Sequence, residues 1–225
     1  MGLPMTMPPL RVAVLASGRG TNLQALLSAQ VEAKLTIDIV AVGSDRPQAM
    51  ALHYAKAAGI PAVILRPITY ATRKEFDQAL FDQLAVFKPE LIVLAGFMRI
   101  LDQDIVSRWY GKLINIHPSL LPKYPGLKTH QRVLANGDIK HGASVHFVTS
   151  ELDGGPVISY TEIKVLPDDD PERLAARLLP QEHRLLTATV KLFADRRILL
   201  KSETVYVDNA PLSQPLHLNE NDQLS

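Results

Sequence analysis

The first half of the chain alternates short apolar runs with longer amphipathic segments, and this rhythm predicts a strand–helix repeat. The apolar runs are bounded by glycine, proline or polar residues, as buried strands are, and lie at 11–16, 37–43, 62–65, 91–96 and 113–117. The segments between them are predicted as helices at 21–30, 48–58, 72–88 and 102–109. Strands that alternate with helices indicate a mostly parallel sheet with helices on both faces, so we predict a Rossmann-like α/β fold.

The helix expected to begin at Thr72 carries the clearest local signals. Thr72 and Glu75 have the spacing of a capping box, in which side chains satisfy the free backbone N–H groups at a helix start. Apolar residues then recur at helical spacing as far as Phe87, and Pro89 is expected to end the helix.

The alternation of predicted strands and helices changes after residue 118. A stretch rich in proline and glycine, 118–126, leads into a helix expected at 128–136. Two strands expected at 143–149 and 156–165 follow it, joined by a loop that contains two glycines. We expect these strands to form an antiparallel extension of the sheet.

A long helix is expected to start at Pro171. Asp170 suits the capping position and Pro171 the first helical position, whereas Pro180 is expected to kink or shorten the helix. Because no internal repeat or linker is visible, we expect one domain over 1–225 with a core at 10–208. The ends, 1–9 and 209–225, are expected to be flexible.

Composition narrows the classes of function. Hydrophobic residues make up 47% of the chain and the net charge is +1, which argues for a globular core and against bulk binding to a nucleic acid. No apolar run approaches the length of about 18 residues that a membrane helix needs, so we expect no membrane partner. The chain has no cysteine, which excludes thiol chemistry and disulfides. With no signal-peptide pattern at the start, we expect a cytoplasmic protein.

Ligands bind outside the carboxyl ends of the strands in open parallel sheets, and four segments fall there. The first, 17–22, reads Ser-Gly-Arg-Gly-Thr-Asn. Its glycines allow close approach of the backbone, and the helix start offers free N–H groups to an anion. Leu23 stands where the dinucleotide fingerprint has its third glycine, and the P-loop lysine is missing. The segment favours a phosphate site; a tight turn before a capped helix is the alternative.

The second segment, 96–101, follows the most apolar strand. Its apolar residues and Arg99 suit a flat ring that carries a carboxylate, although a loop packed against the core would have the same composition.

The third segment contains Asn115 and His117. Residues two apart face the same side of a strand, and Pro118 keeps His117 extended, so the two side chains are expected to project together. An amide beside an imidazole can stabilise an oxyanion and transfer a proton. A structural histidine is the alternative.

The fourth segment, 151–156, places Asp153 before two glycines. If Asp153 reaches His117, its charge is expected to raise the imidazole pKa and to favour the imidazolium ion near neutral pH. The alternative is a turn in which the aspartate only caps the backbone. No histidine pair has compact zinc spacing with acidic partners, so we predict no metal, and no Gly-x-Ser-x-Gly motif supports a serine nucleophile.

These segments occur together in a known family. The chain resembles the phosphoribosylglycinamide formyltransferases, folate-dependent enzymes of purine synthesis, in SGRGTNLQALL, LAGFMRIL, INIHPSLLPKYPGLKTHQRVLANGD, HGASVHFVTSELDGGPVI and QEH. The matches run in order from residue 17 to residue 183. HPSLLP and the distant DGGP are shared by the wider formyltransferase superfamily, whereas YPGL and the SGxGTN loop are typical of the glycinamide enzymes.

The resemblance implies substrate contacts and a catalytic trio. The substrate-binding residues would be Gly20, Thr21 and Asn22 for the phosphate and Glu182 for the ribose. The catalytic residues would be Asn115, His117 and Asp153. Leu179 stands where the family has a polar residue near the substrate, which puts one contact in doubt.

The resemblance also implies a folate site for 10-formyltetrahydrofolate as co-substrate. It would be lined by Arg73, Met98, Arg99, Ile100, Leu101, Asn115 and the loop Thr149, Ser150, Glu151, Leu152 and Asp153. The substrate amine would attack the formyl carbon directly, and Asn115 with protonated His117 would stabilise the oxyanion. No metal and no covalent enzyme intermediate would be needed. The partners would be small molecules, and the protein would be a monomer or a weak homodimer.

Three other functions stay open. A formyltransferase for initiator tRNA is expected to carry a C-terminal nucleic-acid-binding domain, and a formylfolate hydrolase an N-terminal regulatory domain; we expect neither here. A non-catalytic nucleotide-binding module would have the glycine loop without needing Asn115, His117 and Asp153.

Overall fold

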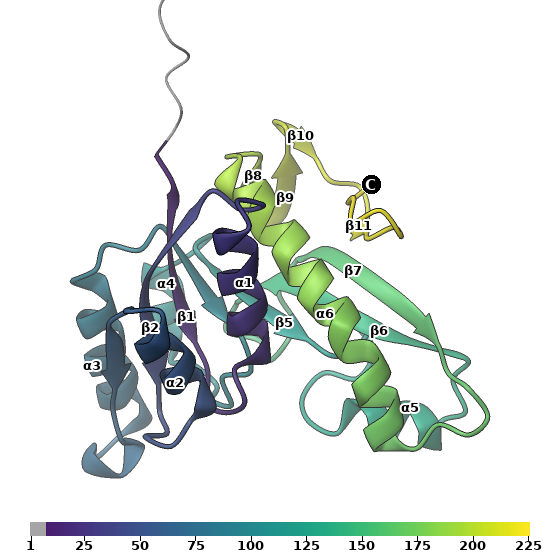
Figure 1. The fold of residues 1–225 in the computed structure, drawn as a ribbon, viewed down its shortest axis with the longest axis horizontal. Helices are drawn as coiled ribbons and strands as arrows, with labels where there is room; N and C mark the ends of the chain where they lie inside the picture. The colour runs from purple at the N-terminus through teal and green to yellow at the C-terminus, as the bar shows by residue number, and fades with distance from the viewer. Residues whose placement is uncertain (1–7) are drawn as a thin grey trace, which may run out of the picture.

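A computed structural model of the chain describes residues 8–225. Within them, an eight-stranded sheet has the order β11-β7-β6-β5-β4-β1-β2-β3 (Figure 1). Five of its strands are mutually parallel: β1 (Leu10–Leu15), β2 (Ile37–Ser44), β3 (Ala62–Ile64), β4 (Leu91–Leu94) and β5 (Leu113–His117). The strands β6 (Lys140–Phe147) and β7 (Val157–Lys164) continue the sheet in antiparallel pairing. The predicted fold class and the antiparallel extension are confirmed.

Helices cover both faces of the sheet. One face carries α1 (Thr21–Val31), α2 (Met50–Ala57) and the long α6 (Pro171–Ala194), which crosses the antiparallel half in Figure 1. The other carries α3 (Arg73–Ala85) and α4 (Gln103–Arg108). Successive side chains of β1 alternate between the two layers: Val12 and Val14 pack with α1 and α6, whereas Ala13 and Leu15 pack with α3 and α4. Burial of both faces explains why the strands read as continuous apolar runs.

Helix α3 confirms its predicted start but ends early. The Thr72 hydroxyl accepts a hydrogen bond from Glu75 N at 3.1 Å, while the Glu75 carboxylate accepts from Ala71 N rather than from Thr72 N. The expected continuation to residue 88 is wrong. Tighter turns, with Phe87 N donating to Leu84 O and Lys88 N to Ala85 O, end the helix, and Lys88 takes a left-handed φ of 50°.

Helix α6 is not shortened at Pro180, so of the two effects expected of this proline, a kink or an earlier helix end, the earlier end does not occur. Asp170 caps it by accepting from Arg173 N at 2.7 Å, and it then runs through Pro180 to Ala194. Leu178 before the proline and Leu185 after it are buried in the same core cluster. Packing on both sides of Pro180 therefore outweighs the backbone hydrogen bond that the proline cannot make.

The C-terminal segment is more ordered than the sequence indicates. Two unforeseen strands, β8 (Ile198–Lys201) and β9 (Thr204–Val207), form a small antiparallel sheet with β10 (Ala210–Pro211). Beyond it, β11 (Leu216–His217) pairs with β7, and Leu218 N donates to Tyr160 O at 2.9 Å. Residues 209–225 were expected to be flexible, but Leu218 is buried against the core and holds them on the sheet.

The short helices complete the chain. A single 3-10 turn, η1 (Pro67–Thr69), precedes α3, and α5 (Thr129–Ala135) lies where a helix was expected at 128–136. Of the expected flexible start at 1–9, residues 1–7 lie outside the described part of the chain, and β1 begins at Leu10. In residues 8–225 no helix has the length and apolar character to cross a membrane.

Candidate functional site

Three predicted catalytic residues meet at the carboxyl end of β5. Asn115 and His117 project from this strand, and Asp153 comes from the loop between β6 and β7. The carboxylate Oδ2 of Asp153 lies 3.4 Å from His117 Nδ1, and its Oδ1 lies 3.4 Å from the amide nitrogen of Asn115. The sequence therefore identified a group of side chains that are direct neighbours in space.

The backbone around Asp153 is tightly constrained. Asp153 has a left-handed φ of 50°, and its Oδ2 accepts a hydrogen bond from Gly126 N at 2.8 Å. A side chain at Gly155 would place its Cβ 1.9 Å from Phe147 O, so only glycine lets this loop approach the end of β6. These constraints aim the carboxylate at His117.

His146 belongs to the same cluster, although no local sequence signal marks it. Its Nε2 lies 3.1 Å from the amide nitrogen of Asn115 and 3.6 Å from Asp153 Oδ1. Its Nδ1 lies 2.8 Å from Phe147 O. Because a carbonyl only accepts, Nδ1 carries a proton there, which leaves Nε2 of a neutral ring to accept from Asn115. The strand register pairs Asn115 directly with His146, but that register is not readable from either strand alone.

The protonation of His117 differs from the expectation. The residue is only 6% exposed, and burial lowers its pKa below 6.5. The Tyr124 carbonyl, 2.9 Å from Nε2, and the charge of Asp153 raise the pKa but do not reverse the shift. The expected raised pKa is therefore wrong: desolvation outweighs the carboxylate, and the neutral imidazole is favoured near neutral pH.

Asp153 itself stays ionised. Burial on its own raises the pKa of this carboxyl, but the close contact with His146 and the hydrogen bond from Gly126 N, together with the positive charge that His117 and His146 carry when protonated, hold the pKa below its ordinary value. The cluster thus places an ionised Asp153 where its charge stabilises the His117 imidazole in its protonated form.

The glycine loop lies at the start of α1. Gly20 has a left-handed φ of 69°, and a Cβ there would lie 2.6 Å from Ala51 Cα, so the loop requires glycine at this position. Thr21 and Asn22 are the first residues of α1, whose free N–H groups favour an anion. Asn22 Oδ1 is buried and has no hydrogen-bond partner among the described residues.

Glu182 reaches this loop from α6. Its carboxylate Oε2 lies 3.5 Å from Asn22 Nδ2. Burial raises the pKa of Glu182 to about 7, and Asn22 and the charge of Arg19 offset only part of that rise. A half-buried carboxyl next to an unpartnered amide oxygen provides polar groups that a hydroxyl-bearing ligand can satisfy.

The segment 96–101 divides its side chains between core and solvent. Leu101 is buried, whereas Met98 and Ile100 are 59% and 51% exposed. The Arg99 guanidinium lies 4.6 Å from the centre of the Phe76 ring, and its charge, with that of Arg73, acts on the buried Asp77. The exposed apolar pair beside two arginines fits the flat, carboxylate-bearing ligand inferred from the sequence.

The loop 149–153 carries Asp153 into the cluster. Thr149 is half-buried, and Ser150, Glu151 and Leu152 are exposed. Leu152 would be in van der Waals contact with a Cβ at Gly126, so its side chain lies next to the segment that binds Asp153.

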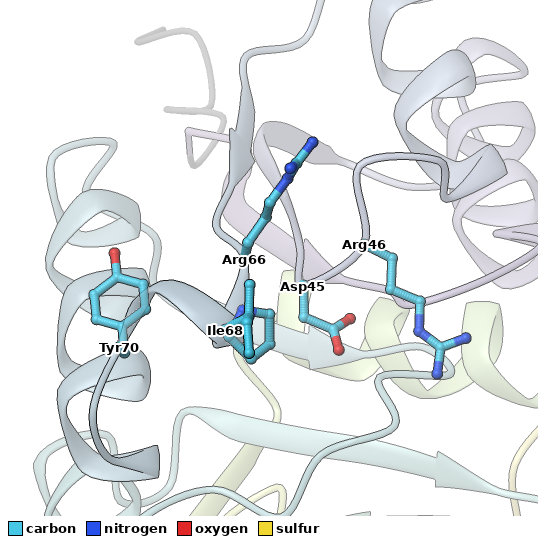
Figure 2. Close-up of a pocket in the computed structure, with 6 residues that line it drawn as sticks. Asp45, Arg46, Arg66, Ile68 and Tyr70 are labelled. Carbon is cyan, nitrogen blue, oxygen red and sulfur yellow. The ribbon is translucent and has the colours of Figure 1, made fainter.

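A hollow opens at the ends of β2 and β3. Its lining includes Asp45, Arg46, Arg66, Ile68 and Tyr70. Figure 2 shows Asp45 between the two arginines, whose side chains extend in different directions. The hollow adjoins segment 96–101, because the Ser17 hydroxyl donates to Asp45 at 2.6 Å and accepts from Met98 N at 2.9 Å.

A family match decides the class of the protein. Residues 10–190 match the model of the formyl transferase family. The chain belongs to this family. It is 42% identical to the phosphoribosylglycinamide formyltransferase of Escherichia coli over 90% of this chain and 96% of that protein. The same-named protein of Haemophilus influenzae is 39% identical, over 93% and 99% of the two chains. The solved phosphoribosylglycinamide formyltransferase of Coxiella burnetii superposes with a TM-score of 0.87 at 44% identity, over 91% and 96%.

The geometry of this formyl transferase suits acyl transfer between two small molecules. The Asn115 amide can donate to an oxyanion, and His117 can take up and return a proton next to the Asp153 carboxylate. Within residues 8–225 no group of three or more His, Asp or Glu side chains is arranged so that it could hold a metal ion.

Proposed function

We propose that this formyl transferase moves the formyl group of 10-formyltetrahydrofolate to the amine of glycinamide ribonucleotide, a step of purine synthesis. The observation that carries the proposal is the contact of Asp153 with both Asn115 and His117 at the end of β5. The names of the E. coli, H. influenzae and C. burnetii relatives support the choice of acceptor.

The ribonucleotide lies along the start of α1. Gly20, Thr21 and Asn22 bind its phosphate through backbone N–H groups and the Asn22 side chain. Glu182 accepts hydrogen bonds from the ribose hydroxyls, which its position 3.5 Å from Asn22 supports. Leu179 is half-buried on α6 and supplies no polar contact, so the phosphate depends more heavily on the glycine loop.

The folate lies along segment 96–101. Met98 and Ile100 offer exposed apolar surface to the ring system, with Leu101 packed beneath them. Arg73 and Arg99 attract the carboxylates of the folate tail. The loop from Thr149 to Asp153 closes the other side, where Leu152 is exposed.

Transfer proceeds without a covalent enzyme intermediate. The substrate amine attacks the formyl carbon, a C–N bond forms, and the formyl oxygen becomes an oxyanion. Asn115 donates to that oxygen, a contribution of about 3 kcal/mol for one well-placed donor. The bond between the formyl carbon and the folate nitrogen then breaks, and the formyl carbonyl re-forms.

His117 moves the proton between the two nitrogens. Because burial keeps its imidazole neutral in the free protein, it can accept the proton released by the attacking amine. The imidazolium so formed lies 3.4 Å from Asp153 Oδ2, which stabilises it. The proton then passes from His117, through a water molecule, to the departing folate nitrogen. The mechanism requires no metal, since the amide and the imidazolium supply the stabilising groups.

The cysteine-free composition supports a reducing, cytoplasmic setting, and the net charge of +1 supports small-molecule rather than nucleic-acid substrates. We propose that the protein acts there as a monomer or a weak homodimer.

One assay tests the acceptor. Purified protein receives 10-formyltetrahydrofolate with glycinamide ribonucleotide, with methionyl-tRNA, or with water alone, and the folate product is followed by absorbance. Turnover that requires the ribonucleotide supports the proposal. Turnover with water alone or with the charged tRNA would overturn it.

A further inference from the structure

The segment Tyr124–Gly126 contacts both His117 and Asp153. The carbonyl oxygen of Tyr124 lies 2.9 Å from His117 Nε2, and Gly126 N donates to Asp153 Oδ2 at 2.8 Å. Two backbone groups of one short segment therefore bind the two members of the imidazole–carboxylate pair.

The Tyr124 side chain anchors this segment. Its hydroxyl donates to Asp138 Oδ2 at 3.0 Å and accepts from Asn136 Nδ2 at 2.8 Å. The guanidinium of Arg132 lies 5.1 Å from the centre of the Tyr124 ring and donates to Pro125 O at 2.6 Å. Tyr124 has a left-handed φ of 57°, a conformation that a tyrosine keeps only where its surroundings hold it.

The contact with the Tyr124 carbonyl affects the orientation and the protonation of the His117 ring. Nε2 of His117 faces the Tyr124 carbonyl and Nδ1 faces Asp153 Oδ2, so both ring nitrogens face an acceptor. A neutral ring can donate at only one of them, whereas the imidazolium donates at both. The carbonyl therefore fixes the ring orientation and favours the protonated ring, against the effect of burial.

We propose that Tyr124 is a positioning residue for the formyl transfer: its hydroxyl, bound to Asp138 and Asn136, holds the Tyr124–Gly126 segment so that its backbone binds His117 and Asp153 together. The kinetic part of this proposal rests on the proposed function. The structural part concerns the free protein and can be tested without substrates.

Several titratable and charged groups surround His117, and a test of Tyr124 has to leave them unchanged. Asp153 lies on the loop before β7, His146 on β6, and Arg132 on α5, and each acts on His117. His130 and His141 also feel its charge. A variant that alters only the Tyr124 hydroxyl leaves all five in place.

The test compares Tyr124→Phe with Tyr110→Phe. Tyr124→Phe keeps the ring under Arg132 but removes both hydroxyl hydrogen bonds. The control variant Tyr110→Phe loses the hydrogen bond that the Tyr110 hydroxyl accepts from Glu203 N, which lies between β8 and β9. We expect kcat of Tyr124→Phe to fall by roughly ten- to hundredfold with KM unchanged. We expect the His117 titration, followed by NMR in the free protein, to move to lower pH. Tyr110→Phe should change neither.

A second variant, Asn136→Ala, removes only the donor to the Tyr124 hydroxyl and is expected to shift the same two measurements in the same direction. Wild-type kcat and an unshifted His117 titration in Tyr124→Phe would overturn the proposal. If wild-type protein shows no formyl transfer at all, the proposed function fails, while the NMR titration still decides whether Tyr124 positions His117.

Discussion

Asn22 Nδ2 lies 3.5 Å from the carboxylate of Glu182, which joins the start of α1 to the middle of α6. The contact is long, and it does not offset the burial that raises the pKa of Glu182 to about 7. In the free protein this carboxyl is therefore partly protonated near neutral pH. A protonated carboxyl is a poorer acceptor for ribose hydroxyls than a carboxylate.

Ribonucleotide binding should therefore strengthen as pH rises through 7. Where Glu182 is protonated, binding has to expel its proton, and the dissociation constant rises by up to about tenfold per pH unit below the pKa. Calorimetry from about pH 6 to about pH 8 measures this. In Glu182→Gln, ribonucleotide binding should be weaker and the pH dependence caused by Glu182 should vanish. If the dissociation constant changes equally with pH in both proteins, Glu182 does not bind the ribose.

Asp153→Asn should nearly abolish turnover. The amide keeps the shape of the side chain but removes the charge that stabilises the imidazolium of His117, so we expect kcat to fall by about 10³-fold. Because the charge of Asp153 raises the pKa of His117, the His117 titration should move to lower pH. Steady-state kinetics and NMR titration measure the two effects. Near-wild-type kcat with intact folding would remove Asp153 from the mechanism.

Acid should destabilise the protein through His141. This buried ring lies 2.8 Å from His130, and burial and the His130 charge lower its pKa from 6.5 to about 4. Between these values the unfolded chain binds a proton that the folded chain excludes. The free energy of unfolding should thus fall as pH drops from 6.5, by about 1.4 kcal/mol per unit, and level off near 4.

Urea unfolding at a series of pH values tests this dependence, with His141→Gln as the reference. The reference is needed because Glu182, whose pKa is raised, acts in the opposite direction over part of the same range. The difference in unfolding free energy between wild type and His141→Gln should narrow as the solution is acidified. A difference independent of pH would show that His141 titrates normally.

Leu218→Ala should destabilise the fold although only seven residues follow Leu218 in the printed sequence. Leu218 is 4% exposed and packs in the core cluster with the α6 leucines. Its truncation should cost about 2–3 kcal/mol of unfolding free energy. Leu199→Ala, at a leucine that is 45% exposed, is the matched control and should cost far less. Equal losses in thermal unfolding would mean that the C-terminal segment does not contribute to the core.

Local sequence patterns determined most of the strands and helices in the first half of this protein. Apolar runs, capping residues and helical spacing follow from backbone geometry within a few residues, so the elements from β1 to β5 were predictable. The projection of Asn115 and His117 from one strand end is equally local, because residues two apart share a face. Asp153 was a candidate because two glycines follow it, and the resemblance then implied its catalytic role, although its distance from His117 along the chain gives no sign of contact.

Only the tertiary structure decided what depends on non-local pairing and burial. His146 joins the site because the β5–β6 register places it opposite Asn115. Leu218 is ordered because β11 pairs with β7, and α6 passes Pro180 because leucines on both sides are buried. The pKa of His117 is lowered because desolvation depends on every group packed around it and exceeds the effect of one carboxylate. Short-range sterics can be read along a chain, but desolvation and strand register are set only when distant segments pack together.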